Sequence, residues 1–255
     1  MTAFSYFRGN LPQGQEMKRK LKNLVKSVLK YLPFRFSRNQ KYDAQTLAIL
    51  QKVLRPGSNA IDVGGHDGEI LQEMLKYAPQ GNHFCFEPLP DYFDRLQKKF
   101  PQAQVYDIAL AETTGETSFN YVVTNPAYSG LKKRAYAGKE TIKEIKVKTA
   151  PLDSIIPEST SIDLIKIDVE GGELGVLKGA KRILSKHKPV VVFEHGKGAS
   201  EFYGTTPEQV FDLFSEMGMH VSLMENYLEG KEVLNKKEFI RQYQEALNYY
   251  FIAHP

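Results

Sequence analysis

From residue 59 onward, short apolar segments alternate along the chain with segments of helical periodicity. In the helical segments the apolar residues recur every three or four positions, which is the spacing of one helix face. Alternation of this kind predicts parallel strands in one sheet, with helices on both of its faces. We place the strands at residues 59–63, 83–86, 104–110, 162–168 and 189–194. The last of these is strongly apolar, which favours a position in the middle of the sheet.

A different pattern interrupts this alternation between about residues 115 and 149. Residues 117–123 and 142–148 each alternate apolar with polar side chains, which predicts an antiparallel β-hairpin inserted into the fold. The segment between them, residues 124–138, is rich in Asn, Gly, Ser and Tyr and is expected to form a loop.

The second half of the chain carries further helix and strand signals. Apolar residues at helical spacing predict one helix over 174–184. Thr206 precedes a proline at the first helical position and a glutamine three residues on, which is the pattern of a helix N-cap. Residues 219–223 and 248–253 then predict a closing pair of strands.

The formal charge of +4 is spread unevenly. Residues 1–42 hold ten basic side chains and one acidic side chain, so this arm carries +9 and the rest of the chain −5. Residues 17–32 place apolar side chains on one helical face and lysines on or beside the other, and Pro33 ends the helix. Such a helix either packs on its own domain or makes peripheral contact with an anionic membrane or another polyanion, and we favour packing. We therefore expect a basic helical arm, 1–42, and a folded domain that begins with a short helix after residue 43.

Composition excludes several classes of protein. Hydrophobic residues make up 42% and charged residues 25% of the chain, which is ordinary globular composition. No apolar run reaches the roughly 18 residues that a membrane span needs, and the first residues lack a signal core. Cys85 is the one cysteine, so a disulfide framework and a multi-cysteine zinc site are excluded. We expect a cytoplasmic protein.

A glycine-rich loop, Asp62-Val63-Gly64-Gly65-His66-Asp67-Gly68, joins the first predicted strand to a helix. Glycines let a backbone approach a ligand closely, and the helix start offers unpaired N–H groups. The loop has neither the dinucleotide-binding nor the P-loop spacing. Asp62 would repel a phosphate but suits a cationic ligand, such as a sulfonium that also carries an amino group. The candidate ligand-binding residues here are Asp62, Gly64, Gly65, His66 and Gly68.

Acidic residues also follow the second strand and lie within the third. Glu87 comes 19 positions after the last loop glycine, a spacing at which a carboxylate can accept hydrogen bonds from both ribose hydroxyls of an adenosine. Asp107 could accept a hydrogen bond from an adenine amino group, and Ile108 and Ala109 complete that candidate pocket. The three acids together are more specific than any one alone.

Three segments of the sequence together resemble FkbM-type methyltransferases. They are the glycine-rich loop, Phe86-Glu87-Pro88, and Ile162-Asp163-Leu164-Ile165-Lys166-Ile167-Asp168-Val169-Glu170-Gly171-Gly172-Glu173 with Leu177-Lys178-Gly179-Ala180. The resemblance spans about residues 59–194, and the family more often has Ala-Asn in place of Gly65-His66. It implies a class I, Rossmann-like α/β fold with a mostly parallel seven-stranded sheet, and residues 43–255 as the methyltransferase domain. It also implies S-adenosyl-L-methionine as cofactor and methyl transfer to a hydroxyl of a sugar, glycoconjugate or natural product.

Candidate bases for such a reaction follow the fourth and fifth strands. They are Asp168, Glu170, Glu194 and His195. Asp168 is expected to face the methionine end of the cofactor or the acceptor, and the pKa range of histidine suits His195 to accept a proton. The same four residues could instead hold a divalent metal, although their spacing does not require one. In the hairpin loop, Asn125, Tyr128 and Ser129 are candidate acceptor contacts.

Other functions remain possible at this level. A nucleotide-binding oxidoreductase shares the adenosine geometry but needs a pyrophosphate site, and a non-catalytic binding protein can keep the same fold. Only the basic arm supports methylation of a nucleic acid, so no nucleic-acid partner is expected. The expected acceptor is a small molecule or a glycan.

Overall fold

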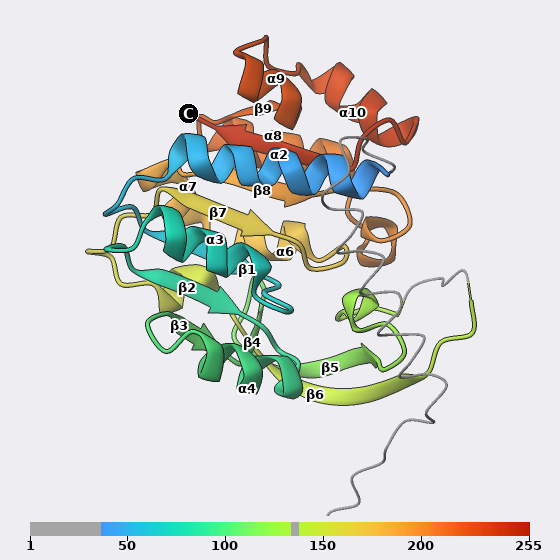
Figure 1. Ribbon diagram of the computed structural model, residues 1–255. Coiled ribbons are helices and arrows are strands. Elements are labelled where there is room, and N and C mark those ends of the chain that lie inside the picture. Colours follow the sequence, from blue (N-terminus) through green and yellow to red (C-terminus); the bar gives the residue numbers. More distant parts are fainter. Residues whose placement is uncertain (1–36, 134–137) are drawn as a thin grey trace, which may run out of the picture. The chain divides into compact units, whose positions relative to one another are not determined.

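Seven strands form the main sheet, in the order β3-β2-β1-β7-β8-β10-β9 (Figure 1). The computed structural model describes residues 37–133 and 138–255, so the helix expected over residues 17–32 lies outside it. The strands are β1 (Ala60–Val63), β2 (His83–Phe86), β3 (Gln104–Tyr106), β7 (Leu164–Ile167), β8 (Val190–Glu194), β9 (His220–Ser222) and β10 (Tyr250–His254). Within this sheet β10 alone runs opposite in direction to all the other strands. This is the mostly parallel seven-stranded sheet that the sequence predicts.

The strand order reverses at β1. Strands β2 and β3 follow β1 on one side, whereas β7 and β8 lie on the other, so β1 pairs in parallel with both β2 and β7. All residues of β1, β2 and β7 are buried, because helices cover both faces of the sheet. In an open α/β sheet, ligands bind at the carboxyl ends of the strands beside such a reversal.

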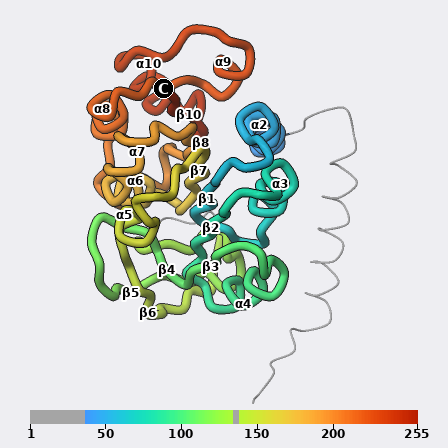
Figure 2. The backbone as a smooth tube through the Cα atoms, turned by 90° about the vertical axis from the view of Figure 1, so that its left-hand side faces the viewer, coloured from blue at the N-terminus to red at the C-terminus, as the bar shows by residue number. Residues whose placement is uncertain are grey.

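Helices lie on both faces, as Figure 2 shows. One face carries α2 (Arg38–Val53), α3 (Glu69–Tyr77) and α4 (Pro90–Lys99), and the other carries α5 (Leu152–Ile155), α6 (Glu173–Lys178), α7 (Lys181–His187) and α8 (Pro207–Glu216). The cap predicted at Thr206 is present, with both hydrogen bonds of a capping box to Gln209. The sequence analysis missed two helices, α9 (Met224–Glu229) and α10 (Lys236–Gln244), which come between β9 and β10 along the chain. Within the described ranges, no helix is both long enough and apolar enough to cross a bilayer.

The predicted hairpin belongs to a second, three-stranded sheet. Strands β5 (Gly115–Val122) and β6 (Ile142–Ala150) pair antiparallel as expected. The predicted strand over 104–110 is wrong as a single element, because it divides at Asp107 into β3 and β4 (Ile108–Leu110). Strand β4 leaves the main sheet and pairs with β6. Asp107 therefore marks the point where the chain passes from one sheet to the other.

The single helix predicted over 174–184 is also wrong, because it divides at Gly179 into α6 and α7. A Cβ at Gly179 would lie 2.3 Å from the backbone oxygen of Ala111, so the chain passes close to a neighbouring segment there. The carboxylate of Asp153 then accepts hydrogen bonds from the backbone N–H groups of Arg182 and Ile183 and caps the new helix start. The short helix expected after residue 43 likewise begins earlier, at Arg38.

Candidate active site

The glycine-rich loop follows β1 at the reversal of strand order. The N–H groups of Gly64 and Gly65 donate to the carbonyl oxygen of Phe86 at 2.9 and 3.2 Å, which ties the loop to the end of β2. Gly64 has a φ of +84°, and a Cβ there would lie 2.0 Å from the carbonyl oxygen of Asp168. A Cβ at Gly65 would lie 2.3 Å from Sγ of Cys85. Close packing within the protein is therefore sufficient to require these glycines, whatever ligand binds.

Glu87 holds the glycine-rich loop from the end of β2. It is buried, and its two carboxylate oxygens accept hydrogen bonds from the backbone N–H groups of His66 (2.8 Å) and Leu89 (3.0 Å). Burial raises the pKa of Glu87 to about 7, although these two hydrogen bonds oppose the shift. Each oxygen keeps acceptor capacity for a further donor, so contact with ribose hydroxyls stays a prediction.

His66 lies in the loop with a positive φ of 44°. Its ring packs on Tyr92, with ring centroids 4.5 Å apart, and the guanidinium of Arg95 lies 4.0 Å from the centroid of that same tyrosine ring. Nδ1 of His66 also lies 3.2 Å from the carboxylate of Asp67. Gly68 has a φ of +77° and precedes α3. These contacts fix the loop conformation beside α4.

Asp62 is the buried carboxylate at the end of β1. Its side chain is 1% exposed, and neither oxygen accepts a hydrogen bond of good geometry from the described residues, although the backbone N–H of Leu71 is near enough to lower its pKa. Nζ of Lys166 lies 3.8 Å from Oδ1, and burial raises the pKa of Asp62 to about 6. Buried polar atoms are almost always hydrogen-bonded in folded proteins. The two oxygens of Asp62 therefore fit a cationic, hydrogen-bond-donating ligand such as an ammonium group.

The predicted adenine contacts lie at the junction of the two sheets. The carboxylate of Asp107 forms an ion pair with Lys148 at 3.0 Å and is 48% exposed. Ile108 is half-buried and Ala109 is buried. An adenine amino group at Asp107 would compete with Lys148, so this contact stays a prediction.

Three of the four candidate bases converge at the ends of β7 and β8. Asp168, Glu170 and Glu194 each offer a carboxylate oxygen, and these oxygens lie within 4.8 Å of one another. We call them the acidic cluster. The hydroxyl of Tyr250, on β10, donates to Oδ2 of Asp168 at 2.5 Å, and Nζ of Lys166 lies 3.5 Å from the same oxygen.

The members of the acidic cluster differ in ionisation. Burial alone would raise the pKa of Asp168, but Lys166 and hydrogen bonds from Tyr250 and Glu194 lower it below its ordinary value. Burial and the negative charges of Asp168 and Glu170 raise the pKa of Glu194 well above its ordinary value. The two shifts run in opposite directions, so Asp168 carries its negative charge more readily than Glu194 does. Oxygens at this spacing could also approach a divalent cation, which the ammonium of Lys166 would oppose.

His195 does not join the acidic cluster. Directly paired residues of antiparallel strands share a face, so Glu194 points to the same face as Tyr250 and His195 to the opposite face. The His195 ring stacks on Tyr243, with centroids 4.8 Å apart, and neither ring nitrogen has a hydrogen-bond partner within the described part of the chain. Burial lowers the pKa of His195 to about 4. A catalytic role for His195 stays a prediction, although its ring lies apart from the three carboxylates of the acidic cluster.

The hairpin loop borders the acidic cluster. A Cβ at Gly130 would lie 3.8 Å from Cβ of Glu170 and 2.9 Å from the hydroxyl of Tyr203, which accepts a hydrogen bond from the N–H of Lys132. Of the predicted acceptor contacts, Tyr128 is exposed, whereas Ser129 is buried and its hydroxyl accepts a hydrogen bond from the Val122 N–H. Gly130 therefore brings this part of the loop beside Glu170, and the predicted acceptor contacts stay predictions.

Three functional candidates escaped the sequence analysis. The position of Lys166 inside an apolar strand could have indicated a site, because a buried lysine needs buried partners for its charge. Glu173, at the start of α6, is buried and accepts hydrogen bonds from the N–H groups of Val169 and Gly171. Tyr250 lies 82 residues from Asp168, and no local pattern indicates their contact.

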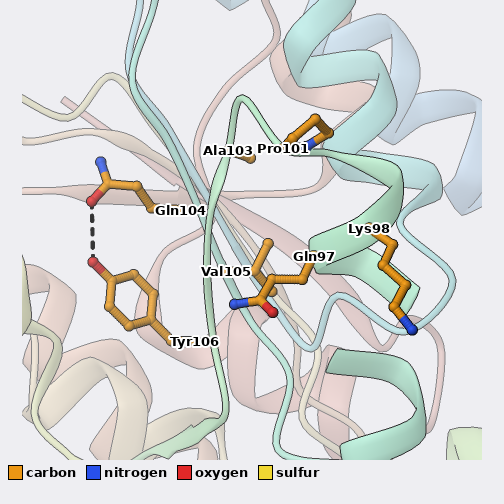
Figure 3. Close-up of a pocket in the computed structure, with 7 residues that line it drawn as sticks. All are labelled: Gln97, Lys98, Pro101, Ala103, Gln104, Val105 and Tyr106. Atoms are coloured by element: carbon orange, nitrogen blue, oxygen red, sulfur yellow. Dashed lines mark hydrogen bonds between the residues drawn. The ribbon is translucent and has the colours of Figure 1, made fainter. Parts of the chain in front are cut away.

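A separate hollow lies at the free edge of the main sheet (Figure 3). Its volume is about 520 Å³, and it is lined by Gln97, Lys98, Pro101, Ala103, Gln104, Val105 and Tyr106. The hydroxyl of Tyr106 donates to Gln104 at 3.2 Å there. The hollow contains none of the candidate residues, so we do not place the active site in it.

The strand order, the glycine-rich loop at its reversal and the acids at the strand ends define a class I methyltransferase fold. The family model for the methyltransferase FkbM domain matches residues 62–221, which is more than half of the chain. The chain therefore belongs to the FkbM methyltransferase family.

Several curated proteins are similar to this chain. The hexuronic acid methyltransferase AglP of Haloferax volcanii is 30% identical over 164 residues, which cover 62% of this chain and 63% of AglP. The 2-O-methyltransferase NoeI of Sinorhizobium fredii is 27% identical over 165 residues, covering 57% and 65%. The AMB antimetabolite synthetase AmbE of Pseudomonas aeruginosa is 27% identical over 235 residues, covering 76% of this chain and 11% of AmbE. The chain thus spans less than two thirds of each relative. The solved FkbM methyltransferase structure from Methylobacillus flagellatus is 14% identical, with a TM-score of 0.48, covering 97% and 63%.

Proposed function

We propose that this protein is an S-adenosyl-L-methionine-dependent O-methyltransferase that acts on a hydroxyl of a sugar, glycoconjugate or natural-product acceptor. The observation that carries the proposal is the buried Asp62 carboxylate, joined through Lys166 to the ionised Asp168. The family of the chain and the names of the relatives AglP and NoeI support it. We also propose residues 43–255 as the catalytic domain. A compact unit over Tyr42–Pro255 supports this boundary.

The first half of the site would hold the cofactor. Asp62 would accept the ammonium group, Glu87 the ribose hydroxyls, and Asp107 with Ile108 the adenine. When bound, S-adenosyl-L-methionine supplies an electrophilic methyl group on a sulfonium. Because that methyl is already reactive, the protein's tasks are to align the acceptor hydroxyl and to remove its proton.

The second half of the site would handle that proton. Asp168 is ionised and partly exposed, so it can accept the hydroxyl proton as the acceptor oxygen gains the methyl group. The hydrogen bond from Tyr250 and the ion pair with Lys166 fix the orientation of this carboxylate. Glu170 faces the hairpin loop and would contact the acceptor. The acceptor is expected to be a small molecule or glycan rather than a nucleic acid, and the cytoplasm stays the expected location.

Two measurements test the proposal. The first is transfer of a labelled methyl group from S-adenosyl-L-methionine to a panel of neutral glycosides and hexuronides, with RNA as comparison. The second is calorimetry with S-adenosyl-L-methionine and with NAD. Binding of NAD alone would indicate an oxidoreductase, and cofactor binding without transfer to any acceptor would indicate a non-catalytic binding protein.

The Glu87→Ala variant tests the cofactor half directly. At about pH 8.5, where Glu87 is ionised, removing this acceptor of two ribose hydrogen bonds should weaken S-adenosyl-L-methionine binding at least tenfold, since each such bond contributes roughly 1.5–3 kcal/mol before compensation. Glu112→Ala, which removes an exposed partner of Lys178, serves as control. Unchanged affinity in Glu87→Ala would contradict the ribose assignment.

A further inference from the structure

Lys166 is a buried cation shared between the two halves of the site. In the register of β1 with β7, it lies directly beside Asp62, and Asp168 follows two residues later on the same face. Its Nζ lies 3.8 Å from Oδ1 of Asp62 and 3.5 Å from Oδ2 of Asp168. The lysine side chain is 10% exposed, so these two carboxylates provide most of the compensation for its charge.

The two carboxylates bind this lysine unequally. Asp168 also accepts a hydrogen bond from Tyr250, whereas Asp62 accepts no hydrogen bond of good geometry from residues 37–133 and 138–255. At 3.8 Å, the contact between Lys166 and Asp62 is an ion pair without a hydrogen bond. A second cation that reached Asp62 with direct hydrogen bonds would therefore pair with it better than Lys166 does.

We propose that Lys166 is a positioning residue that couples the cofactor half of the site to the acidic cluster. This inference rests on the proposed function. An ammonium group held by Asp62 would repel the nearby ammonium of Lys166, because like charges a few ångströms apart in a buried site interact strongly. Lys166 would then pair with Asp168 alone. That pairing keeps Asp168 ionised and oriented toward the acceptor when the cofactor is in place.

The test compares two ligands that differ only in the part facing Asp62. S-adenosylhomocysteine carries the amino-acid end, and 5′-methylthioadenosine lacks it. The affinity for S-adenosylhomocysteine divided by the affinity for 5′-methylthioadenosine reports the contribution of that end. Calorimetry measures this ratio at about pH 8.5, well above the ordinary pKa of carboxyl groups. In Lys166→Met the competing cation is gone, so this ratio should rise about three- to tenfold. Asp62→Asn should reduce it strongly.

Controls separate coupling from a loss of structure. A generally damaged site would weaken both ligands equally and leave their ratio unchanged. Lys178→Met, at an exposed ion pair, should leave both affinities unchanged. Lys166→Arg keeps the positive charge, so its affinity ratio should stay within about twofold of the wild-type ratio. In Lys166→Met, kcat should fall about a hundredfold while KM for the cofactor stays equal or decreases.

A second measurement needs only the wild-type protein. Among analogues of S-adenosylhomocysteine, removal of the ammonium should weaken binding more than removal of the carboxylate. The opposite order, or a ratio that falls in Lys166→Met, would assign Lys166 to the carboxylate of the cofactor and overturn the coupling. An unchanged ratio would also overturn it. Wild-type protein that binds neither adenosyl ligand would instead contradict the proposed function itself.

Discussion

Asp168 and Glu194 are two similar carboxyl groups at one site, and their surroundings shift their pKa values in opposite directions. Both are largely buried, but Asp168 has a cation beside it and accepts the Tyr250 hydrogen bond, which favour its charged form. Glu194 faces other negative charges, which disfavour its charged form. Two carboxyl groups with pKa values shifted in opposite directions are typical of catalytic sites.

Tyr250→Phe should impair proton removal by Asp168. The lost hydrogen bond favours the ionised form of Asp168, so its removal raises the pKa of that carboxyl and moves the acid limb of the kcat/KM profile to higher pH. Stability that the lowered pKa provides is present above the ordinary pKa of aspartate and is lost as pH falls, so the variant should lose about 1–3 kcal/mol at neutral pH. A pH–rate profile and urea unfolding measure both effects, with Tyr227→Phe as control. An unshifted acid limb would contradict this role.

His195→Phe tests the candidate role of this histidine as a catalytic base. The ring lies between aromatic side chains and both nitrogens lack hydrogen bonds within the described part of the chain, so an apolar ring should be tolerated. We expect turnover within about threefold of wild type and equal or higher thermal stability. A loss of two to four orders of magnitude in kcat with unchanged cofactor affinity would restore His195 as the base.

At the scale of elements, the β7–α6 connection does most to shape the site. Glu170 adopts a positive φ of 59° and Gly171 one of 104°, a backbone turn that places Glu170 beside Asp168. Glu173, at the start of α6, holds this turn through the N–H groups of Val169 and Gly171. This turn, the hairpin loop at Gly130 and the glycine-rich loop at Gly64 therefore all lie next to residues of the acidic cluster.

Two glycines, one inside α6 and one directly after it, should respond oppositely to alanine. A Cβ at Gly179 would meet the backbone oxygen of Ala111 at 2.3 Å, so Gly179→Ala should destabilise the protein by roughly 2–4 kcal/mol. Gly175 lies inside α6 with nothing within 4 Å of its Cβ position, so Gly175→Ala should stabilise by about 0.5–1 kcal/mol. Urea unfolding of the pair checks the prediction. Equal effects in the same direction would contradict the division of the helix at Gly179.

At the scale of the whole molecule, the site depends on the order of the strands. Asp62, Glu87, Asp168, Glu194 and Tyr250 come from β1, β2, β7, β8 and β10 or their ends, and the reversal at β1 brings them to one edge of the sheet. Burying so many acids together has a cost. Burial raises the pKa of Asp62 to about 6, those of Glu87 and the neighbouring Glu173 to about 7, and that of Glu194 well above its ordinary value.

This cost should appear in the pH dependence of stability. A carboxyl group whose folded-state pKa lies above its unfolded value binds its proton more tightly in the folded protein, so its contribution is full below about pH 4.5 and is lost as pH rises through about 7. Glu173→Gln should remove one such loss of stability, because an amide group does not ionise. Its oxygen can still accept hydrogen bonds from both N–H groups. The variant should therefore gain roughly 1–3 kcal/mol relative to wild type between pH 5 and 8, measured by urea unfolding at each pH. The exposed Glu216→Gln should show no such change.

The sequence alone determined the class of fold and the positions of most candidate residues. Strand and helix periodicity, the capping residues at Thr206 and the glycine-rich loop are local signals, because side-chain spacing and turn chemistry act over a few residues. They placed Asp62, Glu87, Asp168 and Glu194 at strand ends, and a parallel sheet brings such ends together.

Only the tertiary structure decided which of those residues meet. Which face a strand-end side chain takes depends on pairing with distant strands, so Glu194 joined Asp168 and Tyr250 while the next residue, His195, turned to the opposite face. The passage of the chain into a second sheet at Asp107 likewise follows from β4 pairing with β6, some forty residues on. The ion pair of Lys166 with Asp62 follows from the register of β7 with β1, two strands about a hundred residues apart in the sequence. Such contacts are long-range, and no window of local sequence contains both partners.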